Sequence, residues 1–419
     1  MAGIGGGPNF SNQNSNTSSS SAPHSHHHHH QAPKILLAKP ALVTAAKYNH
    51  GGAPAGDDPS SSLRSRLPSV GFLNLLSDSW DFHTDRFLPF LTDNTDFTVI
   101  GVIGPTGVGK STIMNEIYGF DATSSGMLPP FAIESVETKA MAKHCTVGIE
   151  PRITSERIIL LDTQPVFSPS VLAEMIRPDG SSTVSVWGGE SLPAELAHEL
   201  MSIQLGVLLT SICHIILVVS EGVHDNNMWR LMATVDLLKH SIPDPSSLSL
   251  SHPQSFNTVS DKEIKDKMQE VGEEYMASPI FVHTKLHDQD LAPHYLVQMK
   301  KALTCYFSST SFNKQKHQNA SKEKNVSSLN PEDDSDPTLF KSFFIPSKYN
   351  TDSLQYESYS SSLWKLRDQV LSMGGPSFSR TVSERDWLKN SGKIWELVKN
   401  SSTISDYCRT LQSSGLFRR

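Results

Sequence analysis

Short apolar runs alternate with longer stretches in which apolar residues recur every three or four positions. A continuous apolar run is typical of a strand buried on both faces, and the longer period is typical of a helix with one buried side. The expected strands are Phe97–Ile103, Thr146–Ile153, Arg157–Leu161, Cys213–Ser220, Pro279–Thr284 and Phe340–Ile345. Helical spacing falls at Ser111–Tyr118, Ser168–Ile176, Pro193–Leu209, Asn226–Leu238 and Asp290–Tyr306. This alternation predicts an α/β fold, with a mostly parallel sheet covered by helices on both faces.

The same patterns divide the chain into four parts. Residues 96–350 hold the alternating strands and helices, interrupted by three polar stretches expected to be inserted loops, at about 177–192, 242–260 and 308–337. Before them, residues 66–95 predict a helical lead-in, because apolar residues between Leu67 and Leu91 allow one or two amphipathic helices. After them, residues 351–419 predict a C-terminal helical extension, with helices near Leu363–Met373 and Asp386–Leu397.

Residues 1–65 have a different composition. They are rich in Ser, Asn, Gly and Pro and contain the run His26–His30. Such a segment cannot bury enough apolar surface to offset the entropy lost on ordering, so we expect a disordered tail. The histidine run is a spacer or compositional bias in this interpretation, with metal binding as the weaker alternative.

Charge and cysteine usage narrow the location and the partners. The net charge of -7 gives no overall attraction to nucleic acid or anionic lipid, and basic residues do not cluster with aromatic ones. The first thirty residues contain no Lys or Arg and no apolar run, which argues against a targeting signal. Four widely separated cysteines without a CxxC pair favour a reducing compartment. We expect a cytoplasmic protein, with the nucleus as a second location.

The stretch Ile203–Ser220 is long and apolar enough to be tested as a membrane span. Its composition changes near Cys213, where leucine-rich sequence gives way to β-branched residues. A buried helix followed by a buried parallel strand explains this change, so we expect no membrane insertion.

A phosphate-binding motif follows the first buried strand. The sequence GPTGVGKS matches GxxxxGK[ST] in full and precedes a helix, the context in which successive backbone N–H groups surround phosphate oxygens. Lys110 is expected to reach the β- and γ-phosphates, and the Ser111 hydroxyl to bind Mg²⁺. The predicted binding residues are Gly104, Pro105, Thr106, Gly107, Val108, Gly109, Lys110, Ser111 and Thr112. This motif predicts a P-loop NTPase domain of the G-domain kind.

Two further residues are candidates for the metal site. Asp162 ends the second buried strand, where such folds hold the metal through water, and Thr146 precedes a strand in a position like that of a switch threonine. An aspartate that caps the next turn and a threonine with a structural role are the alternatives.

The sequence after Asp162 departs from that of active GTPases. Their DxxG motif places a glycine N–H on the γ-phosphate, whereas this chain has Pro165, which has no N–H to donate. Val166 stands where Ras-like enzymes place the glutamine that orients water, and the spacing of Gln164 does not show that it takes that task. We therefore expect slow or absent hydrolysis and a protein that is not an enzyme in the ordinary sense.

The position that reads the base is also altered. A G domain has NKxD after the corresponding strand, and this chain has Thr284, Lys285, Leu286 and His287, with Asp288 one place late. Lys285 can still cover the base with its aliphatic stem, but no carboxylate stands at the guanine-reading position. ATP and GTP both remain possible ligands.

Together these segments resemble the SMG-nine family of the nonsense-mediated mRNA decay machinery. The resemblance rests on GVIGPTGVGKST, RIILLDTQPVFSPSVL, MSIQLGVLLTSICHIILVV and SEGVHDNNMWRLMATVDLL, and DTQP in place of DxxG makes it specific. It covers about residues 96–306 and extends more weakly to residue 397. The resemblance implies a regulatory scaffold that pairs with an SMG-eight-like G-domain subunit and joins the SMG kinase, which is related to phosphatidylinositol 3-kinases. From charge and composition we expect no direct binding of nucleic acid and no membrane partner.

Two alternatives remain open at this point. One is a divergent GTPase or ATPase switch, in which another group performs the task of the missing glycine. The other is a G-domain-like protein that holds no nucleotide. The residues alone do not decide between them and a nucleotide-holding scaffold.

Overall fold

A computed structural model of the chain describes residues 73–77, 79–121, 127–141, 143–176, 192–250, 275–313, 340–348 and 356–415. The predicted disordered tail and most of the three predicted inserted loops lie outside the described residues. In the part of the second loop that is described, Ile242, Asp244 and Ser246 are buried.

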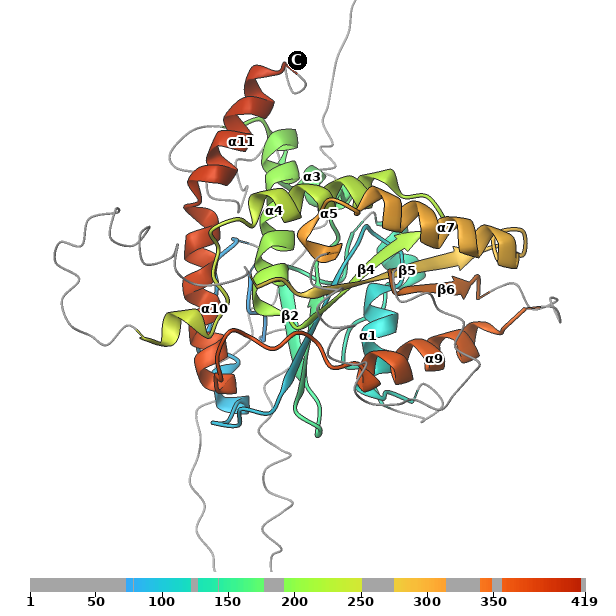
Figure 1. Ribbon diagram of the computed structural model, residues 1–419, viewed down its shortest axis with the longest axis horizontal. Helices are drawn as coiled ribbons and strands as arrows, with labels where there is room; N and C mark the ends of the chain where they lie inside the picture. The colour runs from blue at the N-terminus through green and yellow to red at the C-terminus, as the bar shows by residue number, and fades with distance from the viewer. Residues whose placement is uncertain are drawn as a thin grey trace, which may run out of the picture. The chain divides into compact units, whose positions relative to one another are not determined.

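One six-stranded sheet forms the centre of the described structure (Figure 1). In spatial order its strands are β2 (Ile149–Ile153), β3 (Ile158–Thr163), β1 (Thr98–Ile103), β4 (Ile215–Glu221), β5 (Ser278–Leu286) and β6 (Ser342–Pro346). All neighbouring pairs are parallel except β2 and β3, which a short turn joins as an antiparallel hairpin. The predicted mostly parallel sheet is therefore confirmed.

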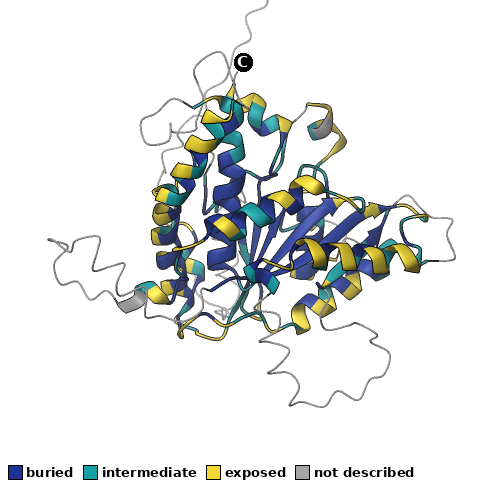
Figure 2. Ribbon diagram, turned by 45° about the horizontal axis from the view of Figure 1, so that its top comes forward, coloured by how far each residue is buried: buried dark blue, intermediate teal, exposed yellow. Residues whose placement is uncertain are grey.

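Helices cover both faces of the sheet, as the alternating pattern predicts. Helices α1 (Lys110–Tyr118) and α9 (Tyr359–Ser372) share one apolar core with the sheet. On the other face lie α4 (Ala194–Ile212), α5 (Asn226–Leu238) and α7 (Pro293–Tyr306), joined by α10 (Glu384–Lys399) and α11 (Ser402–Ser413), which pack on α4. Figure 2 shows the strands buried between these layers. The shorter helices are η3 (Leu88–Phe90), α2 (Val136–Ala140), α3 (Pro169–Met175) and η5 (Ser247–Leu250).

The apolar stretch Ile203–Ser220 is divided between two elements. Helix α4 ends at Ile212 and β4 begins at Ile215, both largely buried. Within the described part of the chain, no helix has the length and apolar character needed to cross a membrane.

The predicted helical lead-in is wrong for the residues that the structure describes. Residues 73–91 run mostly without regular structure, with bridges from Leu76 to Phe82 and to Ile149 on β2, and only the three-residue η3 is helical. Trp80 adopts a positive φ of 65°, which a continuing helix does not allow. Its ring meets Trp395 edge to face at 5.7 Å, so contacts with a distant helix determine the path of this segment.

A buried carboxylate ties the C-terminal helices to the start of the domain. Glu384, the first residue of α10, is fully buried and accepts hydrogen bonds from Arg157 Nε at 2.6 Å and from Thr92 N at 2.7 Å. An ionised carboxylate is stable in such a place only when it is paired and hydrogen-bonded. Helix α10 is therefore an integral part of this core and more than an appended helix.

A partly buried histidine between α4 and β4 predicts acid sensitivity. His214 Nδ1 accepts a hydrogen bond from the Val99 N–H at 2.9 Å, and the ring lies 4.2 Å from that of Phe378. Burial lowers the pKa of His214 to about 4. As the pH falls, His214 is protonated in the unfolded chain before it is protonated in the folded chain. Its contribution to the free energy of unfolding is therefore fully present above pH 6.5 and is lost as the pH falls toward 4.

We expect the free energy of unfolding to drop by about 2–3 kcal/mol between pH 7 and 4.5 through this group alone. Denaturant unfolding measures the free energy of unfolding of the wild type and of His214→Asn at both pH values. The difference between the two proteins should become smaller by that amount when the pH is lowered from 7 to 4.5. His294→Asn, at an exposed position on α7, is the matched control and should leave the pH dependence unchanged. An equal pH dependence in wild type and His214→Asn would contradict the prediction.

Candidate nucleotide-binding site

The phosphate loop connects β1 to α1 at the carboxyl edge of the sheet. A Cβ atom on Gly104 would lie 2.2 Å from the Val219 carbonyl oxygen, so only glycine fits against β4 there. Gly107 and Gly109 have φ values of +75° and +93°, which turn the backbone around the loop. The buried Val108 side chain anchors the loop in the apolar core below. The backbone thus takes the curved path that exposes successive N–H groups to a phosphate.

Lys110 begins α1 with its ammonium inside the loop. Nζ donates a hydrogen bond to the Pro105 carbonyl oxygen at 2.9 Å. Burial lowers the pKa of Lys110 to about 8, an effect that the nearby carboxylates of Asp162 and Glu134 partly oppose. A buried ammonium in this state gains strongly from an additional anion, such as a phosphate.

The three predicted metal residues meet beside this lysine. Asp162 Oδ2 accepts hydrogen bonds from Ser111 Oγ at 2.7 Å and from Thr146 Oγ1 at 2.8 Å. Asp162 is fully buried, and burial raises the pKa of its carboxyl, opposed chiefly by Lys110. Its other oxygen, Oδ1, is buried and has no hydrogen-bond partner.

This oxygen set fits Mg²⁺. The ion binds through one or two protein oxygens, with water and substrate phosphates as its remaining ligands. The unpartnered Oδ1 and the two hydroxyls supply such oxygens. Among the described residues there is no group of three or more His, Cys, Asp or Glu that could hold a metal without a phosphate. Mg²⁺ bound here would neutralise charge on the phosphates.

A cavity of about 160 Å³ opens in front of the loop. Five of its wall residues follow from no motif in the sequence: Ala132, Ile133, Glu134, His144 and Cys145. They lie between α1 and β2, and their approach to the loop depends on the fold of the whole domain. The other lining residues are Thr106, Gly107, Gly109, Lys110, Ser111, Thr112, Thr146, Thr163 and Pro165.

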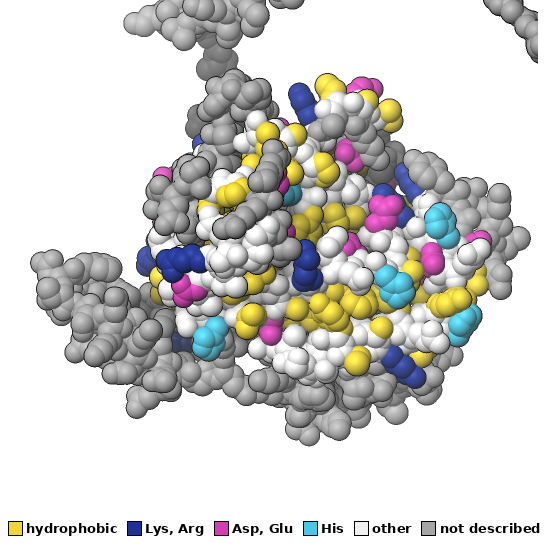
Figure 3. Space-filling view, turned by 90° about the horizontal axis from the view of Figure 1, so that it is seen from above, with side chains coloured by type: hydrophobic (Ala, Val, Ile, Leu, Met, Phe, Trp, Pro, Cys, Tyr) yellow, Lys and Arg dark blue, Asp and Glu magenta, His cyan; other side chains and the backbone are white. Residues whose placement is uncertain are grey.

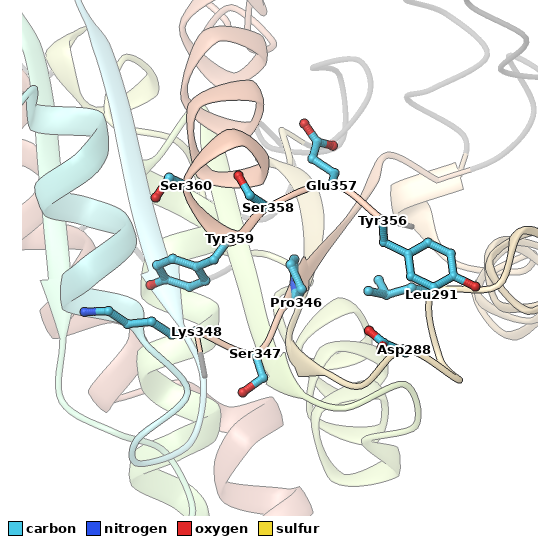
Figure 4. Close-up of a pocket in the computed structure, with 10 residues that line it drawn as sticks. All are labelled: Asp288, Leu291, Pro346, Ser347, Lys348, Tyr356, Glu357, Ser358, Tyr359 and Ser360. Carbon is cyan, nitrogen blue, oxygen red and sulfur yellow. The ribbon is translucent and has the colours of Figure 1, made fainter. Parts of the chain in front are cut away.

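A second cavity, of about 380 Å³, lies at the carboxyl ends of β5 and β6. Figure 4 shows Lys348 and Tyr359 on one side of it, Tyr356 and Leu291 on the other, and Pro346 between them. The carboxylate that the sequence places one position late, that of Asp288, belongs to this cavity. The remaining lining residues are Ser347, Glu357, Ser358 and Ser360.

Thr284 and Lys285, near the end of β5, lie in different surroundings. Thr284 Oγ1 donates a hydrogen bond to the Val108 carbonyl oxygen at 2.9 Å, which ties β5 to the phosphate loop. The sequence pattern alone did not reveal this role. Lys285 lines neither of the two cavities, and its ammonium pairs with Glu221 at 2.7 Å near the surface. Its predicted contact with a base therefore stays a prediction.

Hydrogen bonds to the backbone of other segments hold Gln164 and Val166, which follow Asp162. The Val166 N–H donates to the Gly104 carbonyl oxygen at 3.1 Å, and the Val166 side chain is buried in the core. Gln164 is paired with Gly148 on both sides, through its backbone N–H at 2.8 Å and its Oε1 at 3.0 Å. Neither residue is among those that line the cavity in front of the loop.

Known proteins similar to this chain are decay factors. It is 30% identical over 364 residues to the nonsense-mediated mRNA decay factor SMG9 of Xenopus laevis, a match covering 80% of this chain and 66% of that protein. The Xenopus tropicalis factor of the same name matches equally, and that of Salmo salar is 29% identical over 369 residues. The chain thus spans 66% of the length of these curated relatives.

Other comparisons add little. No family model matches the chain. Elongation factor SelB from Methanococcus maripaludis, in complex with a GTP analogue, is 10% identical with a TM-score of 0.27, covering 66% of this chain and 34% of that one. The GTP-bound GTPase-like domain of Saccharomyces cerevisiae Ski7 is 13% identical with a TM-score of 0.25, covering 66% and 51%. These superpositions are too loose to compare sites.

The similarity to the amphibian and fish factors, at 29–30% identity, extends over 80% of this chain. On this similarity, the chain belongs to the SMG9 family of nonsense-mediated mRNA decay factors.

Proposed function

We propose that this chain is a regulatory scaffold subunit of the nonsense-mediated mRNA decay machinery that holds a Mg²⁺-bound nucleotide with little or no hydrolysis. One observation supports this most strongly. A well-formed phosphate loop and a cluster of Mg²⁺-binding oxygens lie beside Pro165, which stands where active GTPases have the glycine N–H of the DxxG motif.

The arrangement around Pro165 explains the expected lack of turnover. Pro165 lines the cavity without an N–H for the γ-phosphate, and Val166 turns its side chain into the core. Phosphoryl transfer to water depends on positioning the nucleophile and on stabilising the developing charge. Both of these contributions are weakened on the same side of the site, while the binding contributions of Lys110 and Ser111 remain.

The second cavity offers a place for the nucleotide base. It lies at the carboxyl ends of parallel strands, the edge at which open α/β sheets bind ligands. Tyr356 and Tyr359 provide aromatic faces, and Asp288 and Lys348 provide polar contacts. None of these side chains selects one purine by its position, so ATP and GTP are both candidates.

The partners in this proposal follow from the family. They are a second, SMG-eight-like G-domain subunit and the SMG kinase, with the cytoplasm as the main location and the nucleus as a second. Figure 3 supports a protein partner over nucleic acid on the face that it shows. Lys and Arg side chains there lie apart, interspersed with acidic ones, and do not form the basic stripe that nucleic acid requires.

Affinity purification of the chain from its native source tests the proposal directly. We expect mass spectrometry to identify a G-domain partner and a large kinase of the phosphatidylinositol 3-kinase type in the eluate. Chromatography of small molecules from the same eluate should recover ATP or GTP in amounts close to one per chain. Nucleotide-free protein without these partners would contradict the proposal.

Asp162→Asn provides a test of the metal cluster. Asparagine keeps an oxygen that can accept from Ser111 and Thr146 but removes the negative charge that attracts Mg²⁺. We expect Mg²⁺ to strengthen nucleotide binding at least about tenfold in the wild type and by less than about twofold in the variant. Titration calorimetry with Mg²⁺ and with EDTA measures both values.

The chain offers a matched control for this substitution. Asp244 is also buried and also bound by hydroxyls, those of Ser246, Ser247 and Ser379, but it lines neither cavity. Asp244→Asn should keep the full effect of Mg²⁺. A full Mg²⁺ effect in Asp162→Asn would remove Asp162 from the metal site.

A further inference from the structure

A row of hydroxyl groups leads from the phosphate loop to a histidine in the cavity wall. Thr106 Oγ1 donates a hydrogen bond to Ser168 Oγ at 2.8 Å. Ser168 Oγ lies 2.8 Å from Ser170 Oγ, and Ser170 Oγ lies 2.9 Å from His144 Nδ1. These residues come from three separate segments: the loop itself, the start of α3 and the segment before β2.

One assignment of the hydrogens along this row gives every hydroxyl an acceptor within the row. Each hydroxyl has one hydrogen to donate, and that of Thr106 is used on Ser168. Ser168 is fully buried, so its own hydrogen needs an acceptor, and Ser170 is the one within reach. In this assignment Ser170 donates to His144 Nδ1, which lies 2.9 Å away. With Nδ1 as an acceptor, the neutral ring carries its hydrogen on Nε2.

His144 is one of the residues that line the cavity in front of the phosphate loop. The imidazole lines the cavity together with Lys110, which reaches the β- and γ-phosphates in such loops, and Pro165, which has no N–H. Because Ser170 engages Nδ1, Nε2 is the ring nitrogen left for a ligand in the cavity.

We propose that the Nε2–H of His144 donates a hydrogen bond to the terminal phosphate of a bound nucleoside triphosphate and lets the site distinguish triphosphate from diphosphate. This inference rests on the proposed nucleotide binding. His144 makes the contact that the DxxG glycine makes in active GTPases. It does so from the segment before β2, whereas the DxxG position lies after β3. Ser168 and Ser170 are positioning residues that act through the imidazole.

The same row of hydrogen bonds connects occupancy of the site to its surroundings. A terminal phosphate that binds Nε2–H orients the ring, the ring orients Ser170, and Ser170 stands in the first turn of α3. The segment before β2 and the start of α3 thus take a defined arrangement when a triphosphate is bound. This gives a scaffold a way to report its nucleotide without hydrolysing it.

Binding constants for ATP, ADP, GTP and GDP, measured by calorimetry on the full chain with Mg²⁺, test the inference. We expect His144→Ala to lower the ratio of triphosphate to diphosphate affinity about tenfold, the usual effect of losing one hydrogen bond to a charged group. Diphosphate affinity should stay within about twofold, which also shows that the variant is folded. His144→Gln, whose amide can donate in place of Nε2–H, should restore most of the ratio.

Two more variants separate a specific contact from a structural one. Ser170→Ala removes the partner of Nδ1 and should lower the ratio about threefold, less than His144→Ala, because the ring keeps its place but not its tautomer. His294→Ala, an exposed histidine on α7 outside both cavities, should keep the wild-type ratio.

The possible failures are distinguishable. If His144→Ala keeps the wild-type ratio, or lowers triphosphate and diphosphate affinity equally, the inference is overturned and the proposed function stands. If the wild-type chain binds none of the four nucleotides, the proposed function fails and the inference fails with it.

Discussion

Lys110→Met is expected to weaken nucleotide binding by about a hundredfold or more, because it removes a buried ammonium that contacts two phosphates. This ammonium donates a hydrogen bond to the Pro105 carbonyl oxygen at 2.9 Å, and burial lowers the pKa of Lys110 to about 8. A bound polyphosphate supplies the missing negative charge. Methionine has a similar length and no charge, so it fills the space without supplying the interaction.

Thermal unfolding with and without nucleotide provides the measurement. A ligand that binds only the folded state at about a hundred times its Kd stabilises a protein by about 2.7 kcal/mol. The wild type should show this increase in Tm, and Lys110→Met should show almost none at the same concentration. Lys301→Met, at an exposed position on α7, is the control and should respond like the wild type. A ligand-induced shift in Lys110→Met equal to that of the wild type would rule out the phosphate loop as the binding site.

Trp387→Ala should have the largest effect on stability. Trp387 is fully buried on α10, donates its indole N–H to the Ile212 carbonyl oxygen at 2.8 Å and meets Phe97 edge to face at 6.3 Å. Truncation leaves a cavity and an unpaired carbonyl, and such substitutions destabilise proteins by about 3–5 kcal/mol. That is a large part of the total stability of a typical domain.

Denaturant unfolding compares this variant with a matched tryptophan. Trp364 on α9 is 59% exposed, so Trp364→Ala should change the free energy of unfolding by less than about 1 kcal/mol. If Trp387→Ala were as mild as Trp364→Ala, helix α10 would not belong to the core of the domain. The measurement thus tests whether the C-terminal helices are part of the fold.

The buried strands, helix α5 and the phosphate loop are predictable because each depends on residues that are close together in the sequence. Apolar runs mark β1, β4 and β5 because strands buried on both faces have no polar side. Helix α5 agrees at both ends with its predicted range, Asn226–Leu238, and Asp225 caps it by accepting from two backbone N–H groups. The phosphate loop is predictable for the same reason, since its glycines and Lys110 are adjacent in the sequence.

What sequence reasoning missed depends on contacts between distant residues. The path of residues 73–91 follows from Trp80 meeting Trp395, which lies 315 positions away. The burial of Glu384 depends on Arg157, and no local pattern shows that pairing. Cavity residues such as Glu134 and His144 come from a segment without a motif, so only the folded domain reveals their place.

The candidate metal site lies between these cases. Ser111 and Asp162 follow from motif and strand end, and the structure brings them together with Thr146 within hydrogen-bonding distance. The spacing does not show whether Gln164 orients water, and in the structure its Oε1 accepts a hydrogen bond from the Gly148 N–H while the residue lines no part of the cavity in front of the loop. Neighbouring residues in the fold thus place Asp162 in the metal cluster and pair Gln164, two positions later, with the backbone.

The most direct test of the central claim is the fate of a bound triphosphate. Purified chain in excess over radiolabelled Mg²⁺–ATP or Mg²⁺–GTP should form a complex from which the nucleotide is recovered intact after hours. Any slow loss should be no faster than in Lys110→Met. Turnover by the isolated chain that Lys110→Met abolishes would contradict the account and identify the protein as a divergent NTPase switch.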